Sequence, residues 1–262
     1  MESITPTFRD RYIIQVPEGT YNAASWFTTG ELNGTEPCDG IIFKDYVKIQ
    51  GIGNRENIVI QLINPYGYND DISILKTQKW NELDNLTLIG SDIRYAVHDD
   101  NWYDTGEKKY IKVTNCEFRC NNGKPAWGAG HSGNCHAEFY NCKFITTGTA
   151  AQHYASFAYH DNLYNNGKSS QIVLFNCRFH VDDANAPCVE FQTYGKAVGG
   201  IRNTYVTMTG CGGNTRINLT TIDDRTSDGT WYVSGFANAM ALAPTISANI
   251  TGETNNLIDL IS

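Results

Sequence analysis

With 262 residues, the chain is long enough to form one large domain or two small ones around a sizeable hydrophobic core. Its 28 acidic residues outnumber its 20 basic residues, and the resulting net charge of −8 argues against a nucleic-acid partner, because phosphates need a basic surface. The same charge argues mildly against a strongly anionic polysaccharide unless local cations offset it. We expect no membrane segment, since no apolar run is long enough to span a bilayer, and the N-terminus has no signal-peptide pattern.

The eight cysteines lack the paired spacing of a zinc site. Three of them occur in near-copies of one phrase, Asn-Cys-x-Phe, at residues 115–118, 141–144 and 176–179. A Cys repeated at an apolar strand position is typical of a small hydrophobic side chain in a stacked core. We therefore expect reduced thiols and synthesis in a reducing cytosol.

The predicted elements are short strands that recur along the chain. Apolar and polar residues alternate in them, as in half-buried strands, over residues 46–51, 84–90, 110–114, 136–140, 171–175 and 203–209. A second short strand follows later in each repeat, over residues 94–98, 126–131, 155–160 and 188–192. No segment keeps apolar residues at helical spacing over three turns, so we expect almost no helix.

The Asn-Cys phrases lie 26 and 35 residues apart, which gives a repeat of about thirty residues. Strand, tight turn, second strand and longer loop at this period predict an all-β fold, a right-handed single-stranded parallel β-helix with coils of about thirty residues. The repeated Asn would form an inward ladder at the turn, each amide bonding to the next coil. A β-sandwich is the alternative, but it does not account for the repeated phrase. We place the β-helix at residues 1–240 and a C-terminal cap or tail at 241–262, because an open end would expose the core.

Segments 13–21, 47–54 and 94–100, together with the Asn-Cys-x-Phe strands, resemble pectate-lyase-like β-helices. They are most similar in style to the β-helix domains of tail spikes and appendages of phages that infect Gram-positive bacteria. The resemblance covers roughly residues 11–240. It implies a virion or bacterial protein, with trimer formation, that engages a bacterial cell-surface polysaccharide or teichoic acid. It implies no mechanism, because this fold carries lyases, esterases, hydrolases and inactive binders, and neither the pectin-esterase nor the pectate-lyase residue set is recognisable.

The second strands end in a series of His and Gln residues at intervals of 33, 29 and 32 residues, close to one coil each. In a common register their side chains would form a row on one flank, roughly 5 Å apart per coil. A neutral imidazole near a carboxylate can act as a general base, and a neighbouring acid can protonate a leaving oxygen. Adjacent strand residues point oppositely, so each His is expected to meet an acid of another coil. The candidate catalytic residues are His98, Asp99, His131, His160, Asp161 and Glu190.

Aromatic, amide and Arg side chains near this row are candidates for stacking or hydrogen bonding to sugar rings. They are Arg94, Tyr95, Trp102, Trp127, Tyr159, Gln192 and Tyr194. A ladder that merely satisfies backbone groups at a turn is the alternative role for the His residues. Calcium is a further candidate ligand for the acidic loops at 180–183 and 223–225, although solvated turns are favoured there. Three hypotheses stay open: glycan binding, glycan cleavage by a lyase or hydrolase, and a non-catalytic structural stalk.

Overall fold

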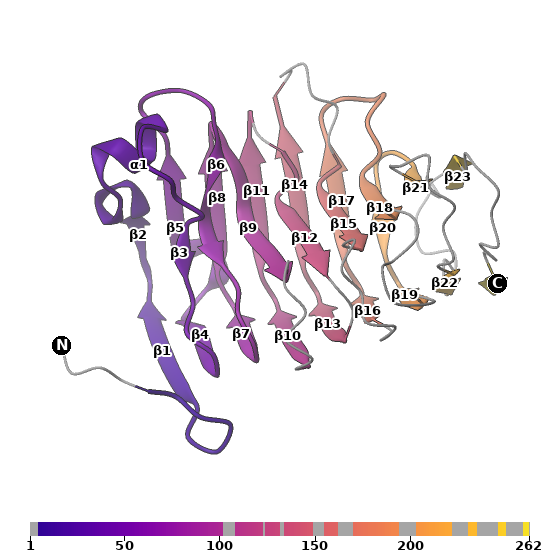
Figure 1. Ribbon diagram of the computed structural model, residues 1–262, viewed down its shortest axis with the longest axis horizontal. Coiled ribbons are helices and arrows are strands. Elements are labelled where there is room, and N and C mark those ends of the chain that lie inside the picture. Colours follow the sequence, from indigo (N-terminus) through magenta and orange to yellow (C-terminus); the bar gives the residue numbers. More distant parts are fainter. Residues whose placement is uncertain are drawn as a thin grey trace.

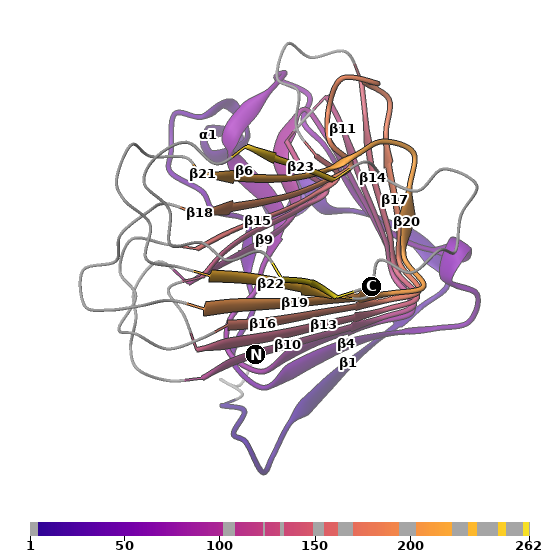
Figure 2. The same ribbon diagram turned by 90° about the vertical axis from the view of Figure 1, so that its right-hand side faces the viewer.

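The computed structural model is a right-handed parallel β-helix whose chain winds repeatedly through three parallel sheets, as Figures 1 and 2 show. The structure describes residues 5–101, 108–122, 124–131, 134–148, 155–161, 170–193, 203–221, 230–234, 246–249 and 259–261. The predicted fold class is confirmed. No helix among the described residues is long and apolar enough to cross a membrane.

Each of the first seven coils contributes one strand to each of three sheets, which we call A, B and C in the order in which the chain meets them. Sheet A contains β1 (Tyr12–Pro17), β4 (Val47–Ile52), β7 (Asn81–Asp84), β10 (Lys109–Thr114), β13 (Cys135–Tyr140), β16 (Ser170–Phe175), β19 (Asn203–Thr209), β22 (Thr230–Ser234) and β24 (Asp259–Ile261). Sheet B contains β2 (Gly19–Asn22), β5 (Ile58–Ile63), β8 (Thr87–Ser91), β11 (Glu117–Asn121), β14 (Lys143–Thr147), β17 (Arg178–Val181) and β20 (Gly212–Gly213). Sheet C contains β3 (Ile41–Ile42), β6 (Asn69–Lys76), β9 (Ile93–Asn101), β12 (Trp127–His131), β15 (Phe157–Asp161), β18 (Val189–Thr193), β21 (Ile217–Thr221) and β23 (Ile246–Asn249).

The sequence predicted two strands per coil, and the structure has three. The predicted first strands fall in sheet A, except for 84–90, which lies mostly in β8 of sheet B, and the predicted second strands fall in sheet C. The strands of sheet B begin almost directly after the Asn-Cys turn, so the phrase that was read as the end of one strand also opens the next. Strands β23 and β24 pair with β21 and β22 beyond residue 240. The expected division of the chain at residue 240 stays a prediction.

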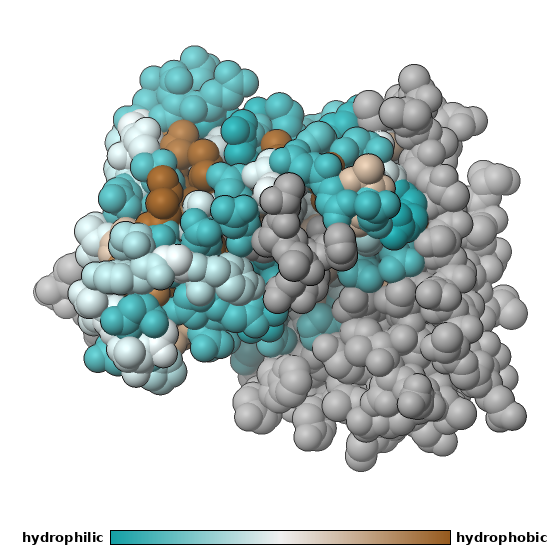
Figure 3. Space-filling model, turned by 90° about the horizontal axis from the view of Figure 1, so that it is seen from above, coloured by the Kyte–Doolittle hydropathy of each residue, from teal (hydrophilic) through white to brown (hydrophobic). Residues whose placement is uncertain are grey.

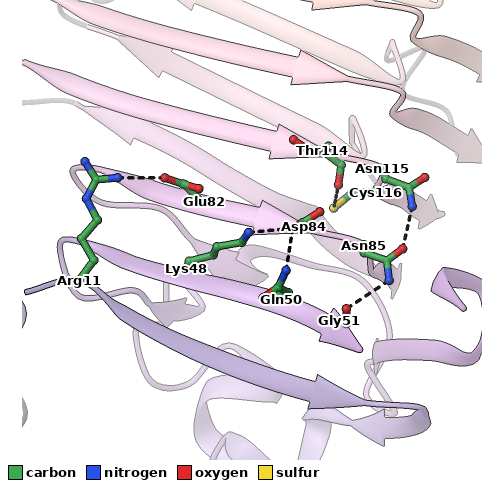
Figure 4. A network of polar contacts seen from close by, with 10 residues as sticks. All are labelled: Arg11, Lys48, Gln50, Gly51, Glu82, Asp84, Asn85, Thr114, Asn115 and Cys116. Atoms are coloured by element: carbon green, nitrogen blue, oxygen red, sulfur yellow. Dashed lines mark hydrogen bonds and ion pairs between the residues drawn. The ribbon is translucent and has the colours of Figure 1, made fainter. Parts of the chain in front are cut away.

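The turn between sheets A and B explains the repeated Asn. Asn85, Asn115, Asn141 and Asn176 all have positive φ, between 51° and 57°, and Asn tolerates this left-handed conformation better than most residues. The Asn115 Nδ2 donates to Asn85 Oδ1 (2.7 Å), as Figure 4 shows, and Asn176 Nδ2 donates to Asn141 Oδ1 (2.8 Å). The expected ladder therefore exists in part, as two pairs with no such bond between Asn115 and Asn141, and it does not point inward. Its side chains lie at the outer corner of the coil, because the left-handed turn directs the following residue into the core instead.

The core is built from the residues that follow these turns and from the alternate residues of each strand. Cys116, Cys142 and Cys177 are fully buried, and all eight cysteines of the chain are free. Beneath sheet B, the rings of Phe118, Phe144 and Phe179 stack with centroid separations of 5.4 Å, one ring per coil. This stack is the interior counterpart of the outer Asn ladder, because both repeat once per coil.

Within the described ranges, helical structure is confined to the first two coils, with η1 (Ala23–Trp26), α1 (Thr29–Asn33) and η2 (Arg55–Asn57). Thr28 and Glu31 form a capping box at the start of α1. The view from above shows hydrophobic residues gathered near the N-terminal end of an otherwise mostly hydrophilic described surface (Figure 3). At this end the inward-facing Ile14 of β1 is 51% exposed, whereas Ile49, its partner in the next coil, is 7% exposed.

Candidate functional site

The register of sheet C overturns the expected row of His side chains. His98 lies opposite Gly128, not opposite His131. His131 lies opposite Asn101 and Asp161, three residues further along the strand. Because side chains alternate between the two faces, an odd offset places His98 and His131 on opposite faces of the sheet. The expected alignment of His98, His131 and His160 on one flank is therefore wrong.

Four of the predicted site residues face the interior. Asp99, Trp127 and His131 are fully buried, and Tyr159 is 1% exposed. A polymer on the outside of the coil has no access to side chains at these positions. The structure thus assigns them to the core, where their contacts are with one another and with neighbouring coils.

Asp99 is the centre of a buried ionic cluster. Its carboxylate contacts Lys109 Nζ at 2.6 Å and His131 Nε2 at 3.2 Å, and it accepts a hydrogen bond from Thr77 Oγ1 at 2.5 Å. His131 thus meets an acid of another coil, whereas His98, for which such a contact was expected, pairs with Asp100 of its own strand. Burial opposes ionisation of Asp99, but Lys109 and His131 outweigh it and hold the pKa of this carboxyl far below its usual range.

The same cluster shifts the pKa of the His131 imidazole in the opposite direction, upward. Burial alone would lower its pKa, but electrostatic interaction with Cys135 and Asp99 raises the pKa of His131 to about 10. Cys135 Sγ lies 3.6 Å from His131 Nε2, and the Tyr159 ring packs edge-on against the imidazole with centroids 5.2 Å apart. His131 is therefore a charged core residue held by its neighbours.

The outer face of sheet C gathers a different set of side chains around two glycines of β12. The Tyr95 ring lies over Gly128, where a Cβ would be 2.6 Å from both Cε1 and Cζ and 2.8 Å from Cδ1 of that ring. Nearly equal distances to three ring atoms place the bare backbone against the face of the ring. The Arg94 Cζ lies 4.9 Å from the Tyr95 ring centre, and the His98 ring lies 5.2 Å from it.

The second glycine of β12 accommodates a His and an acid. A Cβ at Gly130 would be 2.4 Å from His160 Cε1 and 3.0 Å from Asp100 Oδ1, so both side chains lean over this position. His98 Nε2 lies 3.6 Å from the other Asp100 oxygen. Asp100 is thus flanked by two imidazoles. We call these five residues the outer cluster: Arg94, Tyr95, His98, Asp100 and His160.

Charges around the outer cluster are balanced. Three cations, Arg94, Lys76 and Lys124, face three carboxylates, Asp39, Asp70 and Asp100. Lys76 pairs with Asp39 at 2.7 Å, and Lys124 pairs with Asp70 at 2.6 Å. Burial, assisted by the positive charges of Arg94 and Lys76, lowers the pKa of His98 to about 3. His98 is consequently neutral near pH 7 and can both donate and accept a hydrogen bond.

The remaining predicted residues lie apart from this cluster or cannot be placed. Glu190 faces outward on β18, where it accepts a hydrogen bond from Asn218 Nδ2 at 3.0 Å. It lies three strands from His98, which is about 14 Å along the coil axis. Asp161 and Gln192 are described as strand backbone alone, and Trp102 and Tyr194 lie outside the described residues.

The sequence interpretation missed Asp100, Lys109 and the two glycines. Lys109 shares strand parity with the inward-facing Ile111 and Val113, and this parity could have identified it as a buried charge. The alternating Gly-Ala-Gly of β12 could have identified a strand with a bare outer face.

A second set of aromatic side chains lies outside sheet A. Tyr46 stacks on Trp80 with centroids 6.4 Å apart, and Tyr110 stacks on His136 at 5.5 Å. Trp80 and Tyr110 join the two pairs at 5.2 Å. These rings cover one another's faces along the coil axis, so they stabilise neighbouring coils and leave little face for a sugar. The polar pairs Lys48–Asp84 and Arg11–Glu82 lie on the same sheet (Figure 4).

Metal binding finds no support in the described part of the chain, where no group of three or more His, Cys, Asp or Glu side chains could hold an ion. In the acidic loop at 180–183, Asp182 pairs with His180 at 3.1 Å and Asp183 accepts a hydrogen bond from the Asn185 amide. The second acidic loop, 223–225, lies outside the described residues.

Comparisons of the chain with models of known protein families, with curated proteins and with solved structures find no match.

Proposed function

We propose that the outer face of sheet C binds a carbohydrate polymer through the outer cluster. The observation that carries the proposal is the Tyr95 ring, which lies face-on against the backbone of Gly128 with polar groups beside it. In this proposal the side of the ring turned away from Gly128 stacks on the C–H face of a sugar, beside the Arg94 guanidinium that lies over the ring. Sugar hydroxyls beside the ring would meet the neutral His98, the carboxylate of Asp100 and the guanidinium of Arg94.

Binding without hydrolysis is favoured over a two-carboxylate glycosidase. Such enzymes place their two carboxyl groups roughly 5 to 10 Å apart. Among the described residues of this face, Asp100 and Glu190 lie on strands three coils apart, or about 14 Å along the axis. Asp100 and Glu190 are too far apart to act on one glycosidic bond, and the two other carboxylates beside the outer cluster, Asp39 and Asp70, are each paired with a lysine.

The polymer that we propose is a bacterial cell-surface polysaccharide or teichoic acid. This ligand class follows from the resemblance to phage tail β-helices. A place on a phage tail and assembly as a homotrimer belong to the same proposal and rest on the resemblance alone.

The proposal can be tested by measuring retention of the protein on a panel of bacterial cell-wall polysaccharides and teichoic acids. For a polymer that binds, Tyr95→Ala should weaken binding about tenfold, because it removes the stacking surface. Tyr205→Ala is the matched control, since Tyr205 is 39% exposed on β19 of sheet A, and it should bind like the wild type. Equal binding by Tyr95→Ala and the wild type would contradict the proposed site. Shortened polymer in the mass spectrum would show turnover and overturn the proposal of binding alone.

A further inference from the structure

We propose that the outer face of sheet B holds a second binding site, for an oxyanion of the phosphate or sulfate type. The site lies over β11, β14 and β17, on a different face of the coil from the outer cluster. It is independent of the proposed carbohydrate site, and neither proposal depends on the other.

Three cations converge on one buried carboxylate at the start of β11. Glu117 is 4% exposed, and its Oε2 lies 3.3 Å from Arg55 Nη2 and 3.5 Å from Lys143 Nζ. Its Oε1 accepts a hydrogen bond from Arg119 Nε at 2.5 Å and also contacts Nη2 of the same guanidinium. The three cations hold the pKa of Glu117 below its usual range, although burial opposes this. The Glu117 carboxylate therefore holds three cationic side chains close together.

The next coil adds a fourth cation to this strip. Arg178 on β17 lies directly opposite Lys143 on β14, and neighbouring strands are about 4.8 Å apart. Its guanidinium donates to the carbonyl oxygens of Cys177 and Gly210, and it forms no ion pair within the described part of the chain. Its positive charge is thus uncompensated by any carboxylate there.

The strip carries a positive excess on an acidic protein. Four cations, Arg55, Arg119, Lys143 and Arg178, face two carboxylates, Glu117 and Glu56, and Glu56 is a distant partner at 3.8 Å from Arg55. The whole chain carries a charge of −8, so this local excess has the sign opposite to that of its surroundings. It provides the local offset that an acidic protein needs to bind an anion.

The cations differ in how they can meet a ligand. The Arg55 side chain is 13% exposed and acts from below, whereas the Arg119 and Lys143 side chains are 47% and 46% exposed. Glu117 engages two nitrogens of Arg119, which leaves other N–H donors of its planar fork directed away from that carboxylate. A guanidinium fork beside an ammonium group matches the several acceptor oxygens of a phosphate or sulfate group. The Glu117 carboxylate holds Arg119 in place before a ligand arrives.

The site originates in the sequence repeat. Glu117, Lys143 and Arg178 each occupy the position directly after the Cys of an Asn-Cys-x-Phe phrase. In each phrase the Asn forms the turn and the Cys packs in the core, whereas the next position faces outward and can carry different side chains. In these three coils it carries charge, and the repeat stacks those charges one per strand.

The test uses inorganic phosphate added to the full chain at constant ionic strength, with chloride as the reference anion and binding followed by calorimetry. Phosphate should bind the wild type, and Lys143→Gln and Arg119→Gln should each weaken it about tenfold, since each removes one charge-assisted contact. Lys112→Gln is the matched control, because Lys112 lies on the outer face of sheet A, and it should leave phosphate binding unchanged. Thermal unfolding of each variant confirms that it is folded.

A second arm distinguishes a free oxyanion from one carried on a chain. Polyphosphate that binds far more tightly per molecule than inorganic phosphate would indicate an oxyanion on a polymer, and similar affinities would indicate a free ion. Two results would overturn the proposal. One is the absence of phosphate binding over chloride, and the other is an equal loss in Lys112→Gln, which would indicate a general effect of net charge.

Discussion

The charged side chains of sheet B lie outside the coil, whereas sheet C has charged side chains in the interior as well as outside. Beneath sheet B the interior is a stack of phenyl rings, and the cations lie outside. Beneath sheet C the interior holds the ionic cluster of Asp99, Lys109 and His131, and an aromatic ring lies outside. The backbone architecture of the two sheets is the same, so strand parity alone decides which side chains become core and which become surface. The difference predicts that the two sheets respond differently to substitution and to pH.

The largest effect is expected in the interior of sheet B. Phe144→Ala would remove a fully buried ring that contacts Phe118 and Phe179 on both sides, and it should lower the free energy of unfolding by about 3–5 kcal/mol. Denaturant-induced unfolding measures this loss. The neighbouring Ile145 faces outward and is half-buried, so Ile145→Ala should cost about 1 kcal/mol or less. Equal losses for the two variants would contradict the phenyl stack as the support of sheet B.

The interior of sheet C should respond to loss of charge instead. Lys109→Met replaces the lysine by an unbranched side chain of similar length and removes the cation 2.6 Å from the fully buried Asp99. We expect a loss of about 3 kcal/mol, at the low end for a broken buried pair because His131 remains beside Asp99.

The control for this variant is a surface pair. Lys48 contacts Asp84 at 2.7 Å, with both side chains about a quarter exposed, and Lys48→Met should cost about 1 kcal/mol or less. If Lys109→Met were as stable as the wild type, the ionic cluster would be replaceable by apolar contacts, and the contrast between the interiors of the two sheets would lose its energetic basis.

The fold could be predicted because its signal repeats. The Asn of the phrase suits a left-handed turn and the Cys fills the interior beside it, so both recur in successive coils, although Leu86 takes the place of the Cys after Asn85. The third strand of each coil was missed because the turn before it is too short to separate two alternating patterns. The inward direction of the Asn ladder was wrong because the polar side chain at such a turn stays at the corner while its neighbour enters the core.

The site could not be predicted from the intervals between His residues. Those intervals, 33 and 29, suggested equivalent positions. The register instead relates His98 to Gly128 and then to Ala158, at intervals of 30 and 30. Loops of variable length absorb the difference, and an error of three residues exchanges the two faces of a strand. The outer cluster also needs two glycines that leave space for its side chains. Because glycine carries no functional group, these positions are not found by looking for reactive residues.

The smallest of the predicted effects compares two histidines on opposite faces of sheet C. Contacts with Cys135 and Asp99 raise the pKa of His131 to about 10, above the roughly 6.5 of an unfolded chain. The folded state therefore binds the proton more tightly, and its stabilising contribution is complete below about pH 6.5 and falls as the pH rises towards 10. We expect a loss of about 2 kcal/mol between about pH 6.5 and 8.5, measured by denaturant unfolding at each pH. His131→Gln should flatten this alkaline decline.

His98 should give the free energy of unfolding the opposite dependence on pH. Its pKa is lowered to about 3, so the unfolded chain takes up a proton first, and stability should fall as the pH drops below about 6.5. His98→Gln should flatten this acid decline and leave the alkaline one unchanged. Measurements should stop near pH 8.5, because burial raises the pKa of Cys116 and Cys120 to about 12 and their ionisation in the unfolded chain would add a second decline above that pH. If the alkaline decline in stability persisted in His131→Gln, the titration of His131 would not be its cause.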